Sequence, residues 1–314
     1  MTVAWLFPGQ GTQTVGMGKA LADASPAARE IFERADEALG EPLSRLCFEG
    51  PLSELTLTAN TQPAILATSV ATLAALREAL PGLPLPSFGA GHSLGEYSAL
   101  VAADALSLED AVRLVRLRGR AMQDAVPDGE GAMAAVLGGD DATVRSLCEA
   151  AREGEALEPA NFNAPGQIVI SGHAAAVRRA SALAANFKVK TIPLTVSAPF
   201  HSSLMAPAAR AVESALKGIA IAIPAFPIVT NVDAEPNQDA GRIPSLLVRQ
   251  IDGAVKWSQS IAWLAAQGVT QALEIGPGKV LAGLVKKIDK RISVHGVSDP
   301  AGVASTAEYL NFPV

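Results

Sequence analysis

The sequence predicts an α/β fold in which helices cover a mainly parallel β-sheet, with a smaller subdomain inserted. Apolar runs typical of strands alternate with helical patterns along most of the chain, which is the order expected of a parallel sheet. The 314 residues, 49% of them hydrophobic, are enough to bury a large core. We therefore expect a large domain from residues 1–129 and 198–314 and a small subdomain from residues 130–197.

The large domain takes its elements from short apolar runs and longer amphipathic segments, separated by Pro- and Gly-rich loops. The expected strands are Val3–Phe7, Ser87–Gly91, Phe226–Val232, Ala272–Ile275 and Ile292–Gly296. The expected helices include Gln62–Leu80, Leu108–Ala125, Ser203–Leu216, Trp257–Ala266 and Lys279–Lys287.

The inserted segment shows a different order of elements. Strands are expected at Met133–Leu137, Leu157–Phe162, Gln167–Ser171 and Val189–Val196, with helices at Ala142–Arg152 and Ala174–Asn186. The resulting order, β-α-β-β-α-β, is the ferredoxin-like pattern.

Composition argues against several classes of function. A net charge of −6 at pH 7 is unfavourable for a protein whose main partner is nucleic acid. No apolar run approaches the roughly 20 residues that span a bilayer, and the N-terminus lacks the basic start of a signal peptide. Cys47 and Cys148 lie far apart without metal-like spacing, so we expect free thiols in a reducing cytosol. These features predict a cytoplasmic protein with no metal and no membrane partner. We expect a monomer because nothing in the sequence argues for a larger assembly.

The segment Gly91-His92-Ser93-Leu94-Gly95 carries the strongest functional signal. It has the G-x-S-x-G pattern of a nucleophile elbow, and it lies between an expected strand and a helical run of small residues, as that motif requires. Glycine lets the backbone double back, which leaves the serine oxygen exposed at a helix N-terminus. We predict that Ser93 is a nucleophile, with a plain structural turn as the alternative.

A serine nucleophile needs a base, and the chain has 4 histidines to supply it. His92 adjoins Ser93, and adjacent side chains point apart. His173 opens an expected helix, and His295 lies within an expected strand. His201 lies at a junction between strand and helix, where α/β folds carry function. By elimination, we expect His201 to be the base.

The Gly-rich loop Pro8-Gly9-Gln10-Gly11 follows the first expected strand. It lacks both the phosphate-loop and the dinucleotide fingerprints. One interpretation is a plain turn. The other is that its backbone stabilises an oxyanion, together with the N–H of the residue after the nucleophile. On the second interpretation, Gln10 and Leu94 form the oxyanion hole.

Arg118 lies on the apolar stripe of the expected helix Leu108–Ala125. Arg113, Arg116 and Arg120 fall on the opposite side, where we expect them to be solvated. A buried cation is costly unless it is paired. Either another part of the protein supplies an acid, or Arg118 is a fixed fork for a substrate carboxylate.

Several blocks resemble the signature blocks of malonyl-CoA:acyl-carrier-protein transacylases, in family order over nearly the whole chain. They are Phe7-Pro8-Gly9-Gln10-Gly11, Gly91-His92-Ser93-Leu94-Gly95-Glu96-Tyr97, Arg118-Gly119, Ala160-Asn161-Phe162-Asn163 with Pro165-Gly166-Gln167, Ala198-Pro199-Phe200-His201, Val248-Arg249-Gln250 and Glu274-Ile275-Gly276-Pro277-Gly278. The resemblance implies an α/β-hydrolase-like large domain with a ferredoxin-like small subdomain. It also implies ping-pong transfer of malonyl groups from malonyl-CoA to holo acyl carrier protein for fatty acid biosynthesis.

The resemblance further implies a role for each matching residue. Ser93 would be acylated as a malonyl ester, with His201 as its general base. The backbone carbonyl of Gln250 would orient that histidine, so the site is a dyad without an acidic third member. Arg118 would bind the malonyl carboxylate.

The remaining implied residues belong to the oxyanion hole or lie near the active-site cleft. Gln10 and Leu94 match the oxyanion-hole donors, and Asn161 and Asn163 match a segment near the active-site cleft that binds substrate. No metal or tightly bound cofactor is implied, because malonyl-CoA enters as a substrate and phosphopantetheine arrives on the carrier protein.

Other functions share these motifs. A serine thioesterase or esterase would use the same Ser93 and His201 but pass the acyl group to water. A discrete transacylase of a polyketide pathway would have identical motifs. A non-catalytic carrier-binding module would tolerate the loss of either residue, and the presence of both argues against it. The sequence leaves open malonyl against methylmalonyl and the identity of the carrier protein.

An acidic carrier protein would need a local basic patch, because this chain is itself acidic. The candidate docking patch comprises Lys286, Lys287, Lys290 and Arg291. A solvated helix end, whose lysines suit the helix dipole, is the alternative.

Overall fold

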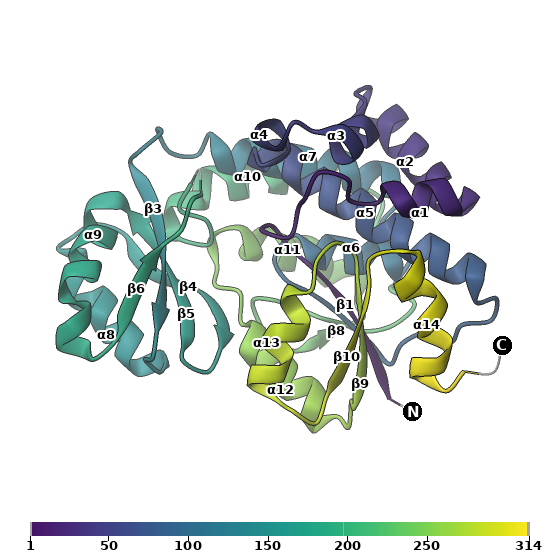
Figure 1. Ribbon diagram of the computed structural model, residues 1–314. Coiled ribbons are helices and arrows are strands. Elements are labelled where there is room, and N and C mark those ends of the chain that lie inside the picture. The colour runs from purple at the N-terminus through teal and green to yellow at the C-terminus, as the bar shows by residue number, and fades with distance from the viewer. Residues whose placement is uncertain (1, 197, 313–314) are drawn as a thin grey trace.

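The computed structural model describes residues 2–196 and 198–312. Within these residues the strands form two sheets, here called the large sheet and the small sheet (Figure 1). The large sheet has 6 strands in the described chain, in the order β10-β9-β1-β2-β7-β8, and only β8 runs antiparallel to its neighbour. Its strands are β1 (Val3–Phe7), β2 (Phe88–Gly91), β7 (Ile228–Val229), β8 (Pro236–Asn237), β9 (Gln271–Ile275) and β10 (Ser293–Val297). The predicted α/β fold with a mainly parallel sheet is confirmed.

Helices cover both faces of the large sheet, as the alternation along β1 requires. Trp5 and Phe7 point into one core, and Ala4 and Leu6 point into a second core on the other face. The second core is covered by α12 (Trp257–Ala266) and α13 (Val280–Ile288). The first is covered by α1 (Lys19–Ala24), α2 (Pro26–Leu39), α3 (Leu43–Glu49), α4 (Leu52–Leu55), α5 (Thr58–Ala79), α6 (Gly95–Ala102), α7 (Leu108–Gln123), α10 (Ala206–Leu216), α11 (Ile243–Asp252) and α14 (Pro300–Leu310).

Two parts of the large domain differ from the sequence-based expectation. The helices α1 to α4, α11 and α14 were not among those predicted. Three of them, α1, α3 and α4, have only 4 to 7 residues each, whereas α2 has 14 residues and an N-cap at Ser25 that could have identified it. The strand expected at Phe226–Val232 shrinks to β7, since Pro227 has no N–H to donate and the chain leaves the sheet after Val229. Asn231 then donates its backbone N–H to Glu96 rather than to a strand.

The small sheet has 4 antiparallel strands in the described chain, in the order β4-β5-β3-β6. With one helix between β3 and β4 and another between β5 and β6, this strand order is ferredoxin-like. One face packs on both helices, while Met133 and Val169 on the opposite face belong to the core of the large domain. The elements are β3 (Gly131–Leu137), α8 (Asp141–Arg152), β4 (Leu157–Ala164), β5 (Gln167–His173), α9 (Ala174–Leu183) and β6 (Lys190–Pro193). They fall within residues 130–197, and the exact domain boundaries stay a prediction.

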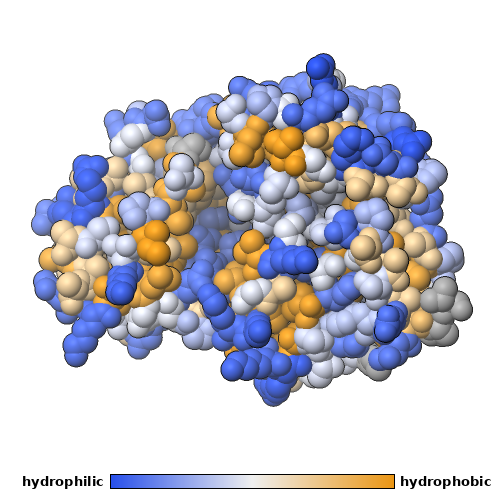
Figure 2. Space-filling view, in the orientation of Figure 1, coloured by the Kyte–Doolittle hydropathy of each residue, from blue (hydrophilic) through white to orange (hydrophobic). Residues whose placement is uncertain are grey.

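The small sheet is joined to the large domain by backbone hydrogen bonds as well as by the chain. Phe162 N–H donates to the Val255 carbonyl at 2.9 Å, and Val255 N–H donates to the Ala160 carbonyl at 2.8 Å. Strand β4 is thereby bonded to the segment that directly follows α11, and α11 is the helix that carries Gln250. The surface is hollowed between the part that carries the small sheet and the rest of the molecule (Figure 2).

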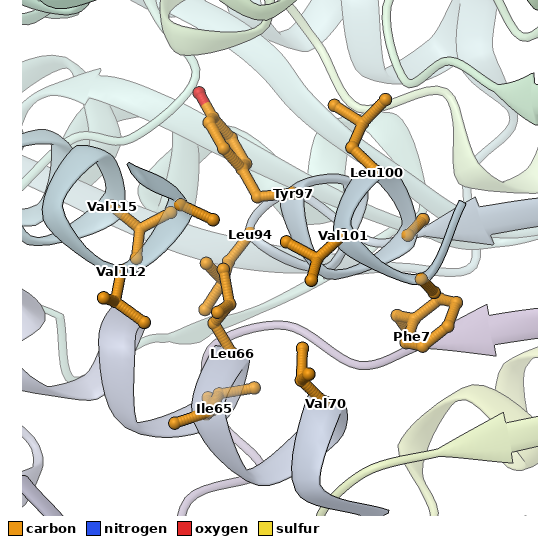
Figure 3. Packing of buried hydrophobic residues seen from close by; sticks show 14 of the residues in the cluster. Phe7, Ile65, Leu66, Val70, Leu94, Tyr97, Leu100, Val101, Val112 and Val115 are labelled. Atoms are coloured by element: carbon orange, nitrogen blue, oxygen red, sulfur yellow. The ribbon is translucent and has the colours of Figure 1, made fainter. Parts of the chain in front are cut away.

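Helix α6 follows the elbow directly and is buried along its whole length. Figure 3 shows Leu94 and Val101 facing Leu66 and Val70 of α5, with side chains of α7 beside them. A helix held by packing on several sides has little freedom to move, so the elbow stands on a rigid support. No helix in the described part of the chain is both long enough and apolar enough to cross a membrane.

Candidate active site

The elbow has the tight geometry that its glycines predict. Strand β2 ends at Gly91 and helix α6 begins at Gly95, so the chain reverses between them. Ser93 takes a φ of 51°, a left-handed conformation that is strained for a residue with a side chain. A Cβ atom on Gly91 would lie 1.9 Å from the Gly95 carbonyl carbon, and one on Gly95 would lie 2.1 Å from the Phe7 oxygen. Close backbone approach therefore requires glycine at both positions.

Ser93, His201 and Gln250 come together as the sequence analysis expected. Ser93 Oγ lies 2.8 Å from His201 Nε2. His201 Nδ1 lies 2.8 Å from the backbone oxygen of Gln250, which can only accept a hydrogen bond. This bond assigns the proton to Nδ1 and leaves Nε2 to accept the serine proton. The geometry is that of a nucleophile beside an oriented base.

The environment of His201 keeps its imidazole neutral. The side chain is buried, and burial, followed by the positive charge of Arg118, lowers the pKa of His201 from 6.5 to about 3. At neutral pH the ring therefore carries one proton, which lies on Nδ1. The neutral form is the one that can take a proton from Ser93.

Arg118 is almost completely buried and contacts the nucleophile. Its Nη1 donates to Gln62 Oε1 at 2.7 Å, and its Nη2 donates to Gln250 Oε1 at 2.9 Å and to Ser93 Oγ at 3.1 Å. The guanidinium carbon lies 5.3 Å from the centroid of the Tyr97 ring. Nε has no hydrogen-bond partner among the described residues.

All three hydrogen-bond acceptors of Arg118 are neutral groups. Of the two alternatives for Arg118, an acid supplied by another part of the protein is therefore not found in direct contact within the described residues. Burial lowers the pKa of Arg118, but a guanidinium remains charged at physiological pH. A buried fork with an unused N–H is suited to bind an anionic group.

Polar side chains that sequence patterns did not identify support the backbone of Ser93 and the side chain of Gln250. The side-chain Nε2 of Gln250 donates to the Ser93 carbonyl at 2.9 Å and to Glu96 Oε2 at 2.8 Å. Asn231 accepts the Ser93 N–H at 2.7 Å and donates to the Gly91 carbonyl at 2.7 Å. Glu96 was detectable as a carboxylate at the start of an apolar run, whereas nothing local marked Asn231 or Gln62.

The reacting groups line a cavity of about 190 Å³ between the large domain and the small sheet. Its polar lining includes Gln10, Asn161 and Asn163, and its apolar lining includes Met133 and Val169 of the small sheet. Asn163 is engaged with the elbow, since its Oδ1 lies 2.8 Å from His92 Nε2. The structure thus places both asparagines at the cleft where the sequence analysis expected them.

The two expected oxyanion donors also lie at this cavity or beside it. Gln10 lines the cavity, and Leu94 follows Ser93 at the N-terminal end of α6. Neither backbone N–H meets an acceptor within the described part of the chain. Both are therefore free to donate to an oxygen of a bound acyl group.

The remaining arginines of α7 correct one expectation. Arg113 and Arg120 are exposed, as expected, but the side chain of Arg116 is only 8% exposed. Its Nη1 donates to the Ala59 carbonyl at 3.0 Å, and its Nη2 pairs with Glu41 at 2.7 Å. The expectation of a solvated Arg116 was wrong because its partners come from α5 and from the loop before α3.

The other expected features can be placed briefly. Cys47 and Cys148 are free and buried. His173 precedes α9 but does not cap it, since its Nδ1 instead accepts the Ala156 N–H at 3.0 Å. His295 stacks on Tyr309, with 4.9 Å between the ring centroids. None of these groups reaches Ser93.

The candidate docking patch lies at the end of α13 and beyond it. Lys286 and Lys287 are exposed in the last turn of the helix, and Lys287 Nζ donates to Gln167 of the small sheet at 3.0 Å. Arg291 pairs with Asp289 at 2.6 Å, which offsets its charge. The free positive charge of the patch therefore resides mainly on its lysines. Among the residues that the structure describes, no cluster of His, Cys, Asp or Glu is suited to hold a metal ion.

Comparison with known proteins gives consistent matches over nearly the full length. The acyl transferase domain family matches residues 4–302. The chain is 51% identical over 310 residues to a malonyl CoA-acyl carrier protein transacylase of Bacillus subtilis (strain 168), covering 98% of this chain and 97% of the relative. It is 46% identical over 307 residues to a protein of the same name from Escherichia coli (strain K12), covering 97% and 98%.

Solved structures agree with the sequence matches. An acyl-carrier-protein-S-malonyltransferase from Bartonella henselae superposes with a TM-score of 0.96 and 47% identity, covering 99% of this chain and 100% of that chain. A malonyl-transacylase in complex with its type II polyketide acyl carrier protein superposes with a TM-score of 0.95 and 44% identity, covering 98% and 100%.

Proposed function

We infer that this chain, which belongs to the family of malonyl-CoA:acyl-carrier-protein transacylases, transfers malonyl groups from malonyl-CoA to an acyl carrier protein. The observation that supports the proposal is that the side chains of His201 and Arg118 both contact the Ser93 hydroxyl oxygen. Ser93 Oγ lies 2.8 Å from His201 Nε2 and 3.1 Å from Arg118 Nη2. A nucleophile, its base and a receptor for a carboxylate therefore meet at the point where an acyl ester would form.

The first half of the reaction forms the malonyl ester. Ser93 Oγ attacks the thioester carbonyl while His201 Nε2 takes its proton. The backbone N–H groups of Gln10 and Leu94 stabilise the negative charge on the carbonyl oxygen. The carbon–sulfur bond then breaks, and the departing coenzyme A sulfur takes the proton from His201.

The second half reverses these steps with a different thiol. The phosphopantetheine thiol of the carrier protein gives its proton to His201, and its sulfur attacks the carbonyl of the malonyl ester. The oxyanion again binds the N–H groups of Gln10 and Leu94. The bond to Ser93 Oγ breaks, and the serine oxygen recovers the proton from His201. The carrier leaves with the malonyl thioester, and the enzyme returns to its starting state.

Arg118 provides selection for a diacid. The malonyl carboxylate lies close to the ester carbonyl in the acyl chain, and Arg118 Nη2 lies close to the ester oxygen. A bidentate contact to the guanidinium would hold the acyl group in one orientation. Asn161 and Asn163 line the same cavity and provide amide groups for the rest of the substrate.

The proposed reaction draws on the chain's own side chains and backbone, with malonyl-CoA and the loaded carrier protein as substrates. That no tightly bound cofactor is needed, that the protein is a monomer and that it is cytoplasmic all stay predictions. Supply of malonyl units for fatty acid biosynthesis is the expected role. Service of a polyketide carrier is the second candidate, because one similar structure was solved with a type II polyketide acyl carrier protein.

A partition assay tests the proposal. The enzyme is mixed with malonyl-CoA in the presence and absence of holo carrier protein, and malonyl-carrier and free malonate are both measured. Transfer to the carrier at a rate far above the release of malonate is the expected result. Equal release of malonate with and without carrier would identify a thioesterase instead. Running the assay with a fatty-acid and a type II polyketide carrier compares the two biosynthetic roles.

A further inference from the structure

The positive charge of Arg118 has no negatively charged group in direct hydrogen-bond contact within the described residues. Its side chain is 1% exposed, yet the groups that accept its hydrogen bonds, on Gln62, Gln250 and Ser93, are all neutral. A cation taken out of water without a counter-charge is strongly destabilising. The structure must therefore offset this charge in another way.

The side-chain amide of Gln250 connects Arg118 to a buried carboxylate. Gln250 Oε1 accepts from Arg118 Nη2 at 2.9 Å, and Gln250 Nε2 donates to Glu96 Oε2 at 2.8 Å. This orientation follows from the partners, because a guanidinium can only donate and a carboxylate accepts. The amide dipole thus points its negative end at Arg118 and its positive end at Glu96.

Glu96 is buried nearly as completely as Arg118. It is 2% exposed, and its Oε2 accepts hydrogen bonds from the Gln250 side chain and the Asn231 backbone. Burial raises the pKa of Glu96 to about 7, while these hydrogen bonds and the charge of Arg118 act in the opposite direction. Among the described residues, no cation donates a hydrogen bond to it.

We propose that Glu96 is the counter-ion of Arg118 and acts through the Gln250 side chain rather than by direct contact. A direct salt bridge would occupy the N–H groups that a substrate carboxylate needs. With the amide between them, the two charges offset each other while Nε of Arg118 stays without a protein partner. Glu96 is therefore a positioning residue, and this inference rests on the proposed function of Arg118 as the receptor of the malonyl carboxylate.

The substitution Glu96→Gln removes the negative charge of the side chain while keeping its size and shape. Its amide oxygen can still accept from Gln250 Nε2 and from the Asn231 N–H, so the hydrogen bonds are retained. With the counter-charge gone, a bound anion becomes the main compensation for Arg118. We expect malonate to bind the variant more tightly than wild type at pH 8.5, where Glu96 is ionised, on the order of tenfold by calorimetry. A purely structural role would weaken binding instead.

Asp252→Asn is the matched control. Asp252 lies at the C-terminal end of α11, the helix that carries Gln250, and it is half-buried with its pKa raised by burial. This variant removes a negative charge from the helix that carries Gln250, and no described hydrogen bond joins the Asp252 side chain to Gln250 or Arg118. Its affinity for malonate should stay within about twofold of wild type.

Arg118→Ala separates failure of this inference from failure of the proposed function. If wild type binds malonate no better than Arg118→Ala, the carboxylate receptor itself is wrong. If wild type exceeds Arg118→Ala but Glu96→Gln binds malonate equally or less tightly than wild type, only the counter-ion is wrong. Neutron diffraction of the wild-type enzyme at pH 8.5 gives a test that does not depend on the stability of any variant. A deprotonated Glu96 is expected, and a deuteron on its carboxyl would overturn the inference.

Discussion

Arg118 Nη2 donates a hydrogen bond to Ser93 Oγ at 3.1 Å, so the residue that would select the substrate touches the residue that would be acylated. The same serine oxygen lies 2.8 Å from His201. The positive charge of Arg118 also contributes to the low pKa of His201. Binding of a carboxylate to Arg118 would offset that charge, which makes it easier for His201 to hold a proton during the reaction. Selection of a diacid and activation of the serine are therefore coupled.

Loss of the guanidinium should change the substrate preference. Arg118→Ala is expected to lower kcat/KM for malonyl-CoA roughly a hundredfold, because charge-assisted hydrogen bonds to the carboxylate are lost. The value for acetyl-CoA should fall much less. Arg118→Lys keeps a charge without the fork and should be intermediate. Parallel measurement of both substrates checks this, and an unchanged preference for malonyl in Arg118→Ala would rule out the carboxylate receptor.

Acid should destabilise the protein through His201. Its pKa is about 3 in the folded state and 6.5 ordinarily, so the unfolded state binds more protons between these values. The free energy of unfolding therefore falls as pH drops below about 6.5, by about 2 kcal/mol at pH 5. His201→Gln should lack this loss. Glu96, whose raised pKa acts with the opposite sign, is present in both proteins.

Urea unfolding of wild type and His201→Gln at pH 7 and pH 5 measures this difference directly. The gap between the two proteins should change by about 2 kcal/mol in favour of the variant on acidification. Parallel stability curves would mean that the imidazole titrates normally and is not held neutral by its surroundings.

The elbow should not tolerate a methyl group. Gly91→Ala would place Cβ 1.9 Å from the backbone of Gly95, and backbone atoms cannot move aside as a flexible side chain can. We expect a loss of at least several kcal/mol of stability or failure to fold. Gly283→Ala is the control, since Gly283 lies within α13 and its Cβ would meet nothing within 4 Å. Thermal unfolding should show the control unchanged or more stable by about 1 kcal/mol. Equal behaviour of the two variants would contradict the elbow geometry.

The docking patch should contribute to binding of the carrier protein and not to binding of malonyl-CoA. Reversing Lys286 and Lys287 to Glu is expected to raise KM for the carrier several-fold at low salt, with KM for malonyl-CoA unchanged. Lys217→Glu, at the exposed end of α10, is the control for a charge reversal outside the patch, to be compared with the single variants Lys286→Glu and Lys287→Glu, which change the net charge equally. No change in carrier KM on reversing the pair would remove the patch from consideration.

Local patterns were sufficient for the residues whose function depends on local geometry. The elbow was predictable because glycine spacing and flanking elements define it within a few residues. Arg118 was recognised because helical periodicity alone places it on the apolar side of α7. His201 was found by elimination, since the chain has only 4 histidines.

Residues whose partners lie far away in sequence were not predictable. Arg116 is buried by Glu41 and Ala59, which no pattern in α7 reveals. The link from Glu96 to Gln250 spans 154 positions and that from Asn231 to Glu96 spans 135. The helices α1, α3 and α4 were missed for a different reason, because each has at most 7 residues and is too short to show a sustained amphipathic pattern. Helix α2, with 14 residues, did carry such a pattern.

Intact-protein mass spectrometry after brief exposure to malonyl-CoA, and again after addition of holo carrier protein, tests the acyl-enzyme most directly. The expected result is a malonyl adduct that maps to Ser93, disappears when the carrier is added and reappears on the carrier. The adduct should be absent in Ser93→Ala. An adduct on another residue, or malonyl-carrier formed at full rate by Ser93→Ala, would contradict the mechanism.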